Sequence, residues 1–171
     1  MALRAVGRES PEPLKSRDAK PEAAVMFEEA REFAGDREAL WRRASKVEDV
    51  PRYWHGTKEL TAVSKEGSVT KAKVRFAFGG SGTAEYEVRE TERKLVIRYV
   101  SGPFVGTQEV WIDMAGIATK WDVRFRGIFR IASGWNEDHF REGSKHALER
   151  LCEGLDARSP GPGDRAAPRE G

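Results

Sequence analysis

Residues 69–90 read VTKAKVRFAFGGSGTAEYEVRE, and apolar and charged side chains alternate along most of this stretch. Successive side chains of a β-strand point to opposite faces, so a period of two predicts strands. We predict strands over Val69–Phe78 and Thr83–Glu90, joined in a hairpin by the turn residues Gly79–Gly82. One face of each strand is apolar and the other charged, which is typical of an antiparallel sheet with one covered face.

The pairing of opposite charges predicts the register of this hairpin. With an effective loop of three residues, Lys73 faces Glu87 across the hairpin. Arg75 then faces Glu85. A strict loop of four residues would set Arg75 against Tyr86 and mix the two faces, so we predict the three-residue register or a bulge.

The alternation recurs on both sides of the hairpin. Ile117–Arg130 is the longest alternating run, and Lys94–Val100 and Gln108–Asp113 predict two further strands. Ala24–Ala34 alternates more weakly and predicts the first strand. The expected sheet therefore has about six to seven antiparallel strands.

Helical spacing appears between the first strand and the hairpin, and again near the C-terminus. Asp36 is placed to cap a short helix whose inward stripe is Leu40, Trp41, Ala44 and Val47. A second helical turn is expected over Glu48–Trp54. Gly134–Leu155 predicts a long final helix, and small residues at the middle of its apolar stripe let a sheet approach closely or leave space for another molecule.

The composition limits the classes of protein to which this chain can belong. The chain has 171 residues with 30 basic and 28 acidic side chains, a net charge of +2 that does not indicate nucleic-acid binding. Six of the eight prolines fall in residues 1–22 and 157–171, which predicts disordered tails around a single domain at 23–156. No apolar run approaches the roughly 20 residues of a membrane span, and we expect a cytoplasmic protein.

Metal and redox cofactors are not indicated. The single cysteine, Cys152, excludes an internal disulfide and any multi-cysteine site. His139, Glu142 and His146 share one sector of the final helix, but that sector lies away from the apolar stripe, and we interpret it as a solvated face. The chain also lacks a nucleophile elbow, a phosphate-binding loop and a dinucleotide-binding fingerprint.

The segment VEDVPRYW at residues 47–54, followed by Gly56 and by KEL at 58–60, resembles the helix-to-strand junction of the START-like (SRPBCC) superfamily. This superfamily includes polyketide cyclase/dehydrase-like and coenzyme Q-binding proteins. The resemblance continues through the strand at 119–129 and the helix at 140–151. It implies the α+β helix-grip fold, in which a curved antiparallel sheet surrounds a long C-terminal helix and two short helices follow the first strand.

The resemblance also implies an apolar cavity between sheet and helix. Most members bind or carry lipids, isoprenoid quinones, steroids or polyketides, and a minority catalyse cyclisation, dehydration or hydrolysis. The side chains expected to line the cavity here are Val74, Phe76, Phe78, Tyr86, Tyr99, Trp121, Val123, Phe125, Phe140, Ser144 and Ala147. The alternative for each is that it fills the interior by packing against its neighbours.

Loops at Trp54–Gly56 and Gly102–Val105 are expected to open the cavity, and Phe104 at the second loop is a candidate membrane contact. The outer arginines of the last strand, Arg124, Arg126 and Arg130, are further candidates for contact with an anionic membrane or a partner. His55, beside the expected opening, is a candidate general base with no recognisable partner.

The sequence therefore favours binding or transport of a hydrophobic small molecule, without a metal or redox cofactor. The first alternative is a cyclase, dehydratase or hydrolase of the same superfamily. For that chemistry the inward-facing polar groups, Tyr86, Tyr99, Thr119 and Ser144, are few. The second alternative is a ligand-free, partner-binding domain resembling chaperone activators, which an exposed apolar patch would support.

Overall fold

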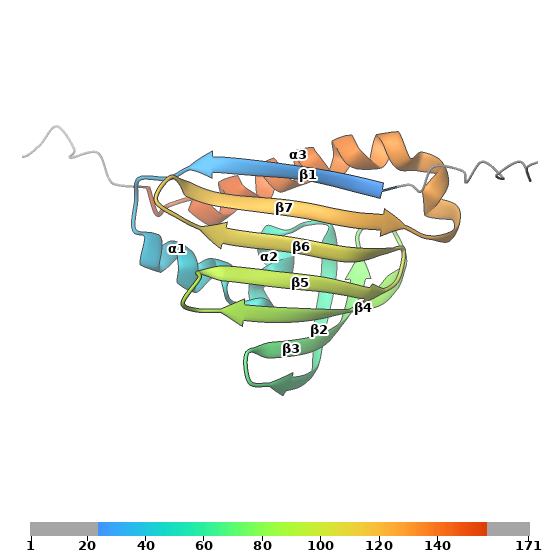
Figure 1. The fold of residues 1–171 in the computed structure, drawn as a ribbon, viewed down its shortest axis with the longest axis horizontal. Coiled ribbons are helices and arrows are strands. Elements are labelled where there is room, and N and C mark those ends of the chain that lie inside the picture. The colour runs from blue at the N-terminus through green and yellow to red at the C-terminus, as the bar shows by residue number, and fades with distance from the viewer. Residues whose placement is uncertain (1–23, 157–171) are drawn as a thin grey trace, which may run out of the picture.

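Seven antiparallel strands form one sheet in the order β1-β7-β6-β5-β4-β3-β2, so β1 and β2 are its two edges (Figure 1). The computed structural model describes residues 24–156, with the side chains of 132–136 excepted; both predicted tails lie outside the described residues. The strands are β1 (Ala24–Glu32), β2 (Thr57–Glu66), β3 (Val69–Phe76), β4 (Ser81–Arg89), β5 (Lys94–Ser101), β6 (Phe104–Ile112) and β7 (Gly116–Phe125).

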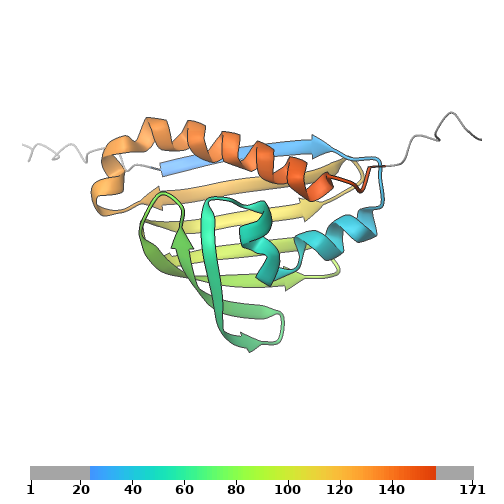
Figure 2. The same ribbon diagram turned by 180° about the vertical axis from the view of Figure 1, so that it is seen from behind.

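The helices cover one face of this sheet, as the view from behind shows (Figure 2). The two edges are connected through α1 (Arg37–Ala44), the 3₁₀ turn η1 (Val47–Asp49) and α2 (Val50–Tyr53). After β7 the chain forms the 3₁₀ segment η2 (Gly127–Ala132) and then the long helix α3 (Ser133–Cys152), which lies against β1. The α+β helix-grip prediction is confirmed, with seven strands and two short helices after the first.

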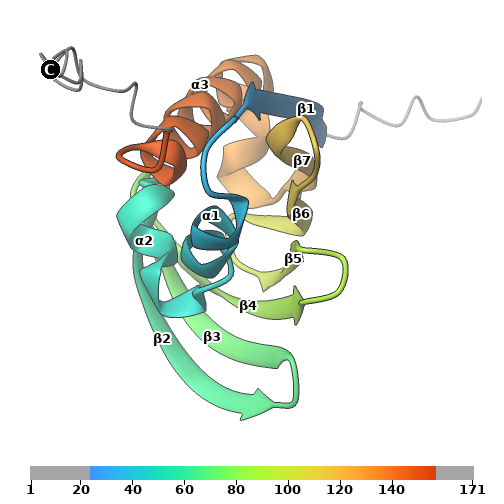
Figure 3. The ribbon, with the colours of Figure 1, turned by 90° about the vertical axis from the view of Figure 1, so that its left-hand side faces the viewer.

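Local sequence explains why the short helices begin where they do. Asp36 has an extended backbone and its Oδ1 accepts a hydrogen bond from the Ala39 N–H at 3.0 Å, the predicted cap. Pro51 lies in the first turn of α2, where its missing N–H costs nothing. The two helices meet the C-terminal end of α3 on the concave side of the curved sheet (Figure 3).

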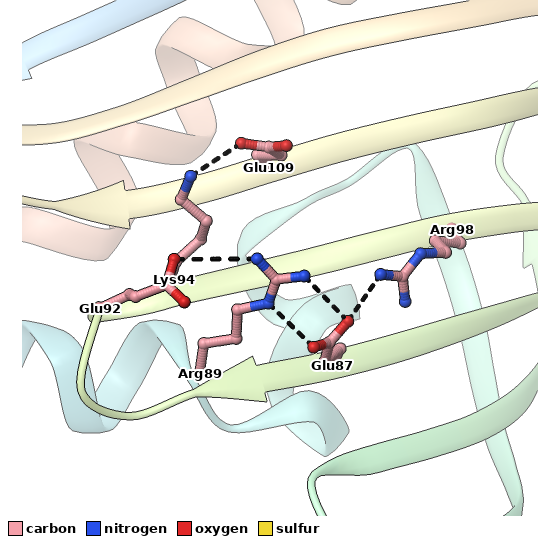
Figure 4. Close-up of polar contacts among 6 residues, drawn as sticks. All are labelled: Glu87, Arg89, Glu92, Lys94, Arg98 and Glu109. Carbon is pink, nitrogen blue, oxygen red and sulfur yellow. Dashed lines mark hydrogen bonds and ion pairs between the residues drawn. The ribbon is translucent and has the colours of Figure 1, made fainter.

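The two faces of the sheet differ as the alternation predicts. Inward side chains of β3 and β4 are buried with the apolar side of α3. On the outer face Glu87 accepts hydrogen bonds from Arg89 Nε at 2.9 Å and from Arg98 Nη2 at 2.7 Å (Figure 4). These hydrogen bonds, first that of Arg89 and then that of Arg98, lower the pKa of Glu87 to about 2.

The predicted hairpin register is wrong. Lys73 pairs with Thr83, not with Glu87, and Arg75 pairs with Ser81, not with Glu85. The Phe76 N–H donates to Gly80 O at 3.0 Å, so β3 ends two residues early and Phe78 stands in the turn. Gly79 and Gly80 adopt φ of 102° and 87°, which glycine accepts without strain and which closes this turn. The displacement is an even number of residues, so each side chain keeps its face.

Other boundaries differ from prediction as well. Strand β6 begins at Phe104, which is only 2% exposed, so the expected membrane-contacting loop tip is instead part of the core. Strand β7 ends at Phe125, since Gly127, with φ of 57°, begins η2. The edge strand β2, whose boundaries the sequence pattern did not predict, is largely exposed, and two register shifts interrupt its pairing with β3.

Gly106 allows β6 to lie close to β7, because it carries no Cβ. Its φ of 135° is unfavourable for other residues, and a Cβ there would collide with Asp122 O and lie 2.7 Å from the Val123 Cα. We expect Gly106→Ala to lower the free energy of unfolding by about 2–3 kcal/mol in urea denaturation.

The matched control is Gly143→Ala. Gly143 lies in α3, and a Cβ at this position would meet no atom within 4 Å, so alanine should raise the free energy of unfolding by about 0.5–1 kcal/mol through helix propensity. Equal effects of the two substitutions would contradict the close approach of β6 to β7.

Candidate ligand-binding cavity

A cavity of about 440 Å³ lies between the concave side of the sheet and α3. Its lining comes from the α2–β2 junction, the end of β3 and the β3–β4 turn, strands β5 to β7 and helix α3. The lining residues are Trp54, His55, Gly56, Thr57, Phe76, Ala77, Phe78, Tyr99, Phe104, Gln108, Trp121, His139, Phe140, Gly143, Ser144, His146 and Arg150.

Aromatic rings form the deep part of the cavity. Tyr99 and Trp121 stack with ring centroids 5.9 Å apart and nearly parallel planes. Phe140 of α3 meets Trp121 edge-on at 4.9 Å, and Phe104 meets Tyr99 edge-on at 4.7 Å. These are favourable geometries between rings, and they make a rigid apolar wall.

A few polar groups are set into this wall. Tyr99 donates its hydroxyl proton to Gln108 Oε1 at 3.0 Å, and Gln108 Nε2 donates to Thr119 Oγ1 at 3.4 Å. The Trp121 Nε1–H donates to Ser144 Oγ at 2.9 Å and joins β7 to α3. Burial raises the pKa of Tyr99 well above its usual value, so this hydroxyl stays neutral and serves hydrogen bonding rather than proton abstraction.

The mouth consists of exposed lining residues. His55 and Gly56 lie on one side of it, and the imidazoles of His139 and His146 on α3 lie on another. His146 Nε2 is 3.2 Å from Glu142 Oε1, one helical turn away on the solvent side. Among residues 24–156 no three His, Cys, Asp or Glu side chains gather in a way that would hold a metal ion.

The predicted site residues divide into two groups. Those that line the cavity are Phe76, Phe78, Tyr99, Trp121, Phe140 and Ser144. Those that do not are Val74, Tyr86, Val123, Phe125 and Ala147, which are buried within the packed core. Both groups face inward, but the residues of the second group are buried among other core side chains and do not border the cavity.

Several lining residues were not predicted from the sequence. Gln108 shares a face with the buried Val110 and Ile112, so the alternation of its strand already indicated an inward position. Phe104 was missed because its strand begins earlier than predicted. Arg150 reaches the cavity from the last turns of α3 and carries no sequence signal for this position. The predicted opening at Trp54–Gly56 does border the cavity.

Comparisons with known proteins identify the type of fold. No protein-family model matches the sequence, and no curated protein is significantly similar to it. A START superfamily protein from Mycobacterium smegmatis is similar in structure, with a TM-score of 0.52 at 14% identity over 74% of this chain and 98% of its own.

Two structures of named enzymes are similar as well. The Zhui aromatase/cyclase from Streptomyces sp. R1128 has a TM-score of 0.51 at 13% identity, over 75% of this chain and 86% of its own. Truncated norcoclaurine synthase from Thalictrum flavum has a TM-score of 0.58 at 13% identity, over 77% of this chain and 94% of its own. At these identities the likeness shows the fold: this chain has the helix-grip fold of START-like proteins.

Tyr86 and Tyr99, which lie within the sheet and are buried, should respond differently to loss of their hydroxyls. Tyr86 Oη has no hydrogen-bond partner among the described residues, so Tyr86→Phe should leave the free energy of unfolding unchanged or raise it by up to ~1 kcal/mol. Tyr99→Phe leaves Gln108 Oε1 without its donor and should lower the free energy of unfolding by about 1–2 kcal/mol. Urea denaturation at neutral pH measures both.

Alkaline pH provides a second readout. Burial raises the pKa of Tyr86 and Tyr99 above the ordinary value of 10, so the folded state keeps these protons longer than the unfolded state. Their contribution to stability is complete below pH 10 and is lost as the pH rises from there toward the folded-state pKa, by at most ~1.4 kcal/mol per pH unit for each tyrosine. An unchanged slope in Tyr86→Phe would show that Tyr86 is not buried as described.

Proposed function

We propose that this protein binds a hydrophobic small molecule, such as a lipid, an isoprenoid quinone or a polyketide-like compound, in the cavity between the sheet and α3. The observation that carries the proposal is an aromatic-walled cavity of about 440 Å³, a volume within the usual range of small-molecule sites. An apolar molecule that buries about 200 Å² there would gain roughly 5 kcal/mol from the hydrophobic effect, before the costs of association.

The polar groups of the wall would orient such a molecule. Ser144 Oγ accepts from Trp121 and keeps its own proton to donate. Tyr99 Oη donates to Gln108 and keeps lone pairs that accept. A carbonyl or hydroxyl on an otherwise apolar ligand would meet a partner at each of these positions, whereas an entirely apolar ligand would not need them.

The alternative is an enzyme, as two of the structurally similar proteins are by name. Its support here is the pair of imidazoles of His139 and His146 at the mouth, one and two residues from Phe140 and Ser144. The buried lining residues include no carboxylate or histidine within 24–156, and the only buried ionisable group among them, Tyr99, has a raised pKa. Acid–base chemistry would therefore have to occur at the solvent-exposed rim, which favours binding over catalysis.

Transient contact with a membrane surface would use segment η2. Ile128 and Ile131 are 77% and 89% exposed, and the exposed Arg126 and Arg130 are interspersed with them. Phe129 of the same segment contacts Phe78 at the cavity mouth, with ring centroids 5.8 Å apart. Exposed isoleucines beside basic side chains suit an anionic lipid surface. None of the helices within 24–156 is long and apolar enough to cross a bilayer.

Vesicle sedimentation tests the membrane contact. The double variant Ile128→Ser/Ile131→Ser should bind vesicles containing phosphatidylserine at least about tenfold more weakly, since two apolar side chains no longer enter the lipid. Met114→Ser is the control: Met114 is 80% exposed in the turn at the opposite end of β7. Equal loss in both variants, or no binding by the unmodified protein, would rule this contact out.

Native mass spectrometry before and after delipidation tests the binding function. The purified protein should carry a hydrophobic molecule in nearly equimolar amount, and delipidated protein should bind it again. Ala77→Trp places a large ring at the exposed edge of the cavity and should weaken rebinding at least about tenfold, equivalent to ~1.4 kcal/mol.

Ala62→Trp is the matched control, because Ala62 is exposed on β2 away from the cavity lining. If delipidated protein binds no hydrophobic molecule, or if both tryptophan variants behave alike, the proposed function is wrong. Turnover of a bound compound, followed by mass change of the ligand, would instead favour the enzymatic alternative.

A further inference from the structure

A second pocket lies where α1, α2 and the C-terminal end of α3 meet, an arrangement visible from the side of the molecule (Figure 3). Its volume is about 270 Å³ and its lining is Arg43, Arg52, Tyr53, Arg150 and Glu153. Three guanidinium groups and one carboxylate thus surround the pocket, which leaves two positive charges unmatched within the lining. The helices bring these arginines together from three separate parts of the chain.

Backbone carbonyls hold two of the arginines in place. Arg43 Nη1 donates to Leu151 O at 2.7 Å and to Glu153 O at 2.9 Å, at the end of α3. Arg150 donates from Nε and Nη2 to Tyr53 O at 2.9 and 2.6 Å. Carbonyls orient a guanidinium group without neutralising its charge, and each group keeps further N–H donors. Both cations are therefore preorganised.

The third arginine has a looser attachment. Arg52 is exposed, and its guanidinium carbon lies 5.7 Å from the centre of the Tyr53 ring, with that of Arg43 at 5.9 Å from the same ring. Within residues 24–156, no carboxylate lies within ion-pairing distance of the side chains of Arg43, Arg52 or Arg150. Like charges gathered this way repel unless an anion joins them.

The pocket adjoins the hydrophobic cavity. Arg150 lines both, and the consecutive residues Tyr53 and Trp54 line the pocket and the cavity respectively. A molecule with its apolar part beside Trp54 therefore needs to extend only past Arg150 to reach the arginines. Guanidinium groups bind carboxylates and phosphates through paired N–H donors, which single out these anions among possible polar groups.

We propose that the pocket of Arg43, Arg52 and Arg150 binds an oxyanion, a carboxylate or a phosphate, carried by the same molecule whose apolar part occupies the cavity. The ligand is then an amphipathic anion rather than a neutral hydrophobic compound. This inference rests on the proposed hydrophobic-ligand function, and it adds a second binding site that shares only Arg150 with the cavity lining.

A pair of matched ligands tests whether the arginine pocket binds an anionic group. Decanoate and decanol have the same chain and differ in the anionic group, and binding to delipidated protein is followed at low salt by the fluorescence of the cavity tryptophans Trp54 and Trp121. We expect decanoate to bind about tenfold more tightly than decanol, because charge-assisted hydrogen bonds exceed neutral ones. The preference should shrink as salt is added, since the site is partly exposed.

Variants of single arginines test whether the preference for decanoate depends on the pocket. Arg52→Gln should remove most of the preference for decanoate while leaving decanol binding unchanged, because Arg52 makes no hydrogen bond that holds the fold among the described residues. Arg52→Lys, which keeps the charge, should retain part of the preference. Arg42→Gln is the control: Arg42 is an exposed neighbour on α1 outside the pocket lining, and its variant should behave as the unmodified protein.

Three outcomes would overturn the inference. Equal affinities for decanoate and decanol, with neither altered by Arg52→Gln, would show that the pocket does not recognise an anionic group on the ligand. The proposed hydrophobic-ligand function would then still stand. Binding of inorganic phosphate that depends on Arg52, without any preference for decanoate, would assign the pocket to a free anion. Failure of both decanoate and decanol to bind would refute the hydrophobic-ligand function itself.

Discussion

The buried hydrogen bond from Trp121 Nε1 to Ser144 Oγ joins the sheet to the long helix and sets how closely they approach. On its C-terminal side α3 presents Ala147, Leu148 and Leu151, which are at most 1% exposed and close the core. Elsewhere on the same helix Phe140 and Gly143, with His146 and Arg150, line the cavity. The Ser144 hydroxyl therefore gives the Trp121 indole N–H an acceptor, and burial of this N–H without a partner would be costly. Ser144 lies where the packed part of the interior meets the open cavity.

Charge is distributed unevenly around this framework. On the outer face of the sheet, acidic and basic side chains pair within and between strands, as Glu87 does with Arg89 on β4 and with Arg98 on β5. At the junction of α1, α2 and α3, carbonyl oxygens hold Arg43 and Arg150, and no carboxylate within residues 24–156 forms an ion pair with either. Pairs on a solvated surface add little stability. An unmatched cluster beside an apolar cavity, in contrast, gives the molecule a polarity that a ligand with one charged end would complement.

Periodicity predicted the sheet, its two faces and the final helix, and with them inward positions such as Phe76, Tyr99 and Trp121. It did not separate these from Val74 or Val123, which face the same way but are buried in the packed core and do not line the cavity. The face of the sheet to which a side chain points follows from the sequence of its own strand. Whether that side chain is packed or borders a cavity depends on which element lies opposite. The hairpin register was mispredicted for a related reason: charge pairing suggested Lys73 opposite Glu87, but glycine backbone conformations at 79 and 80 closed the turn earlier.

Backbone geometry is the same for every strand and helix, so the order of apolar and charged residues was enough to predict most strands, the helices and the covered side of each predicted strand, and the resemblance of residues 47–60 to START-like proteins added the helix-grip fold. The volume and actual lining of the cavity, and the arginine pocket as a whole, were decided only by the tertiary structure. Arg43, Arg52 and Arg150 belong to three helices, and nothing in their spacing along the chain indicates that they meet. Space and charge of this kind arise from contacts between distant segments, which local periodicity does not encode.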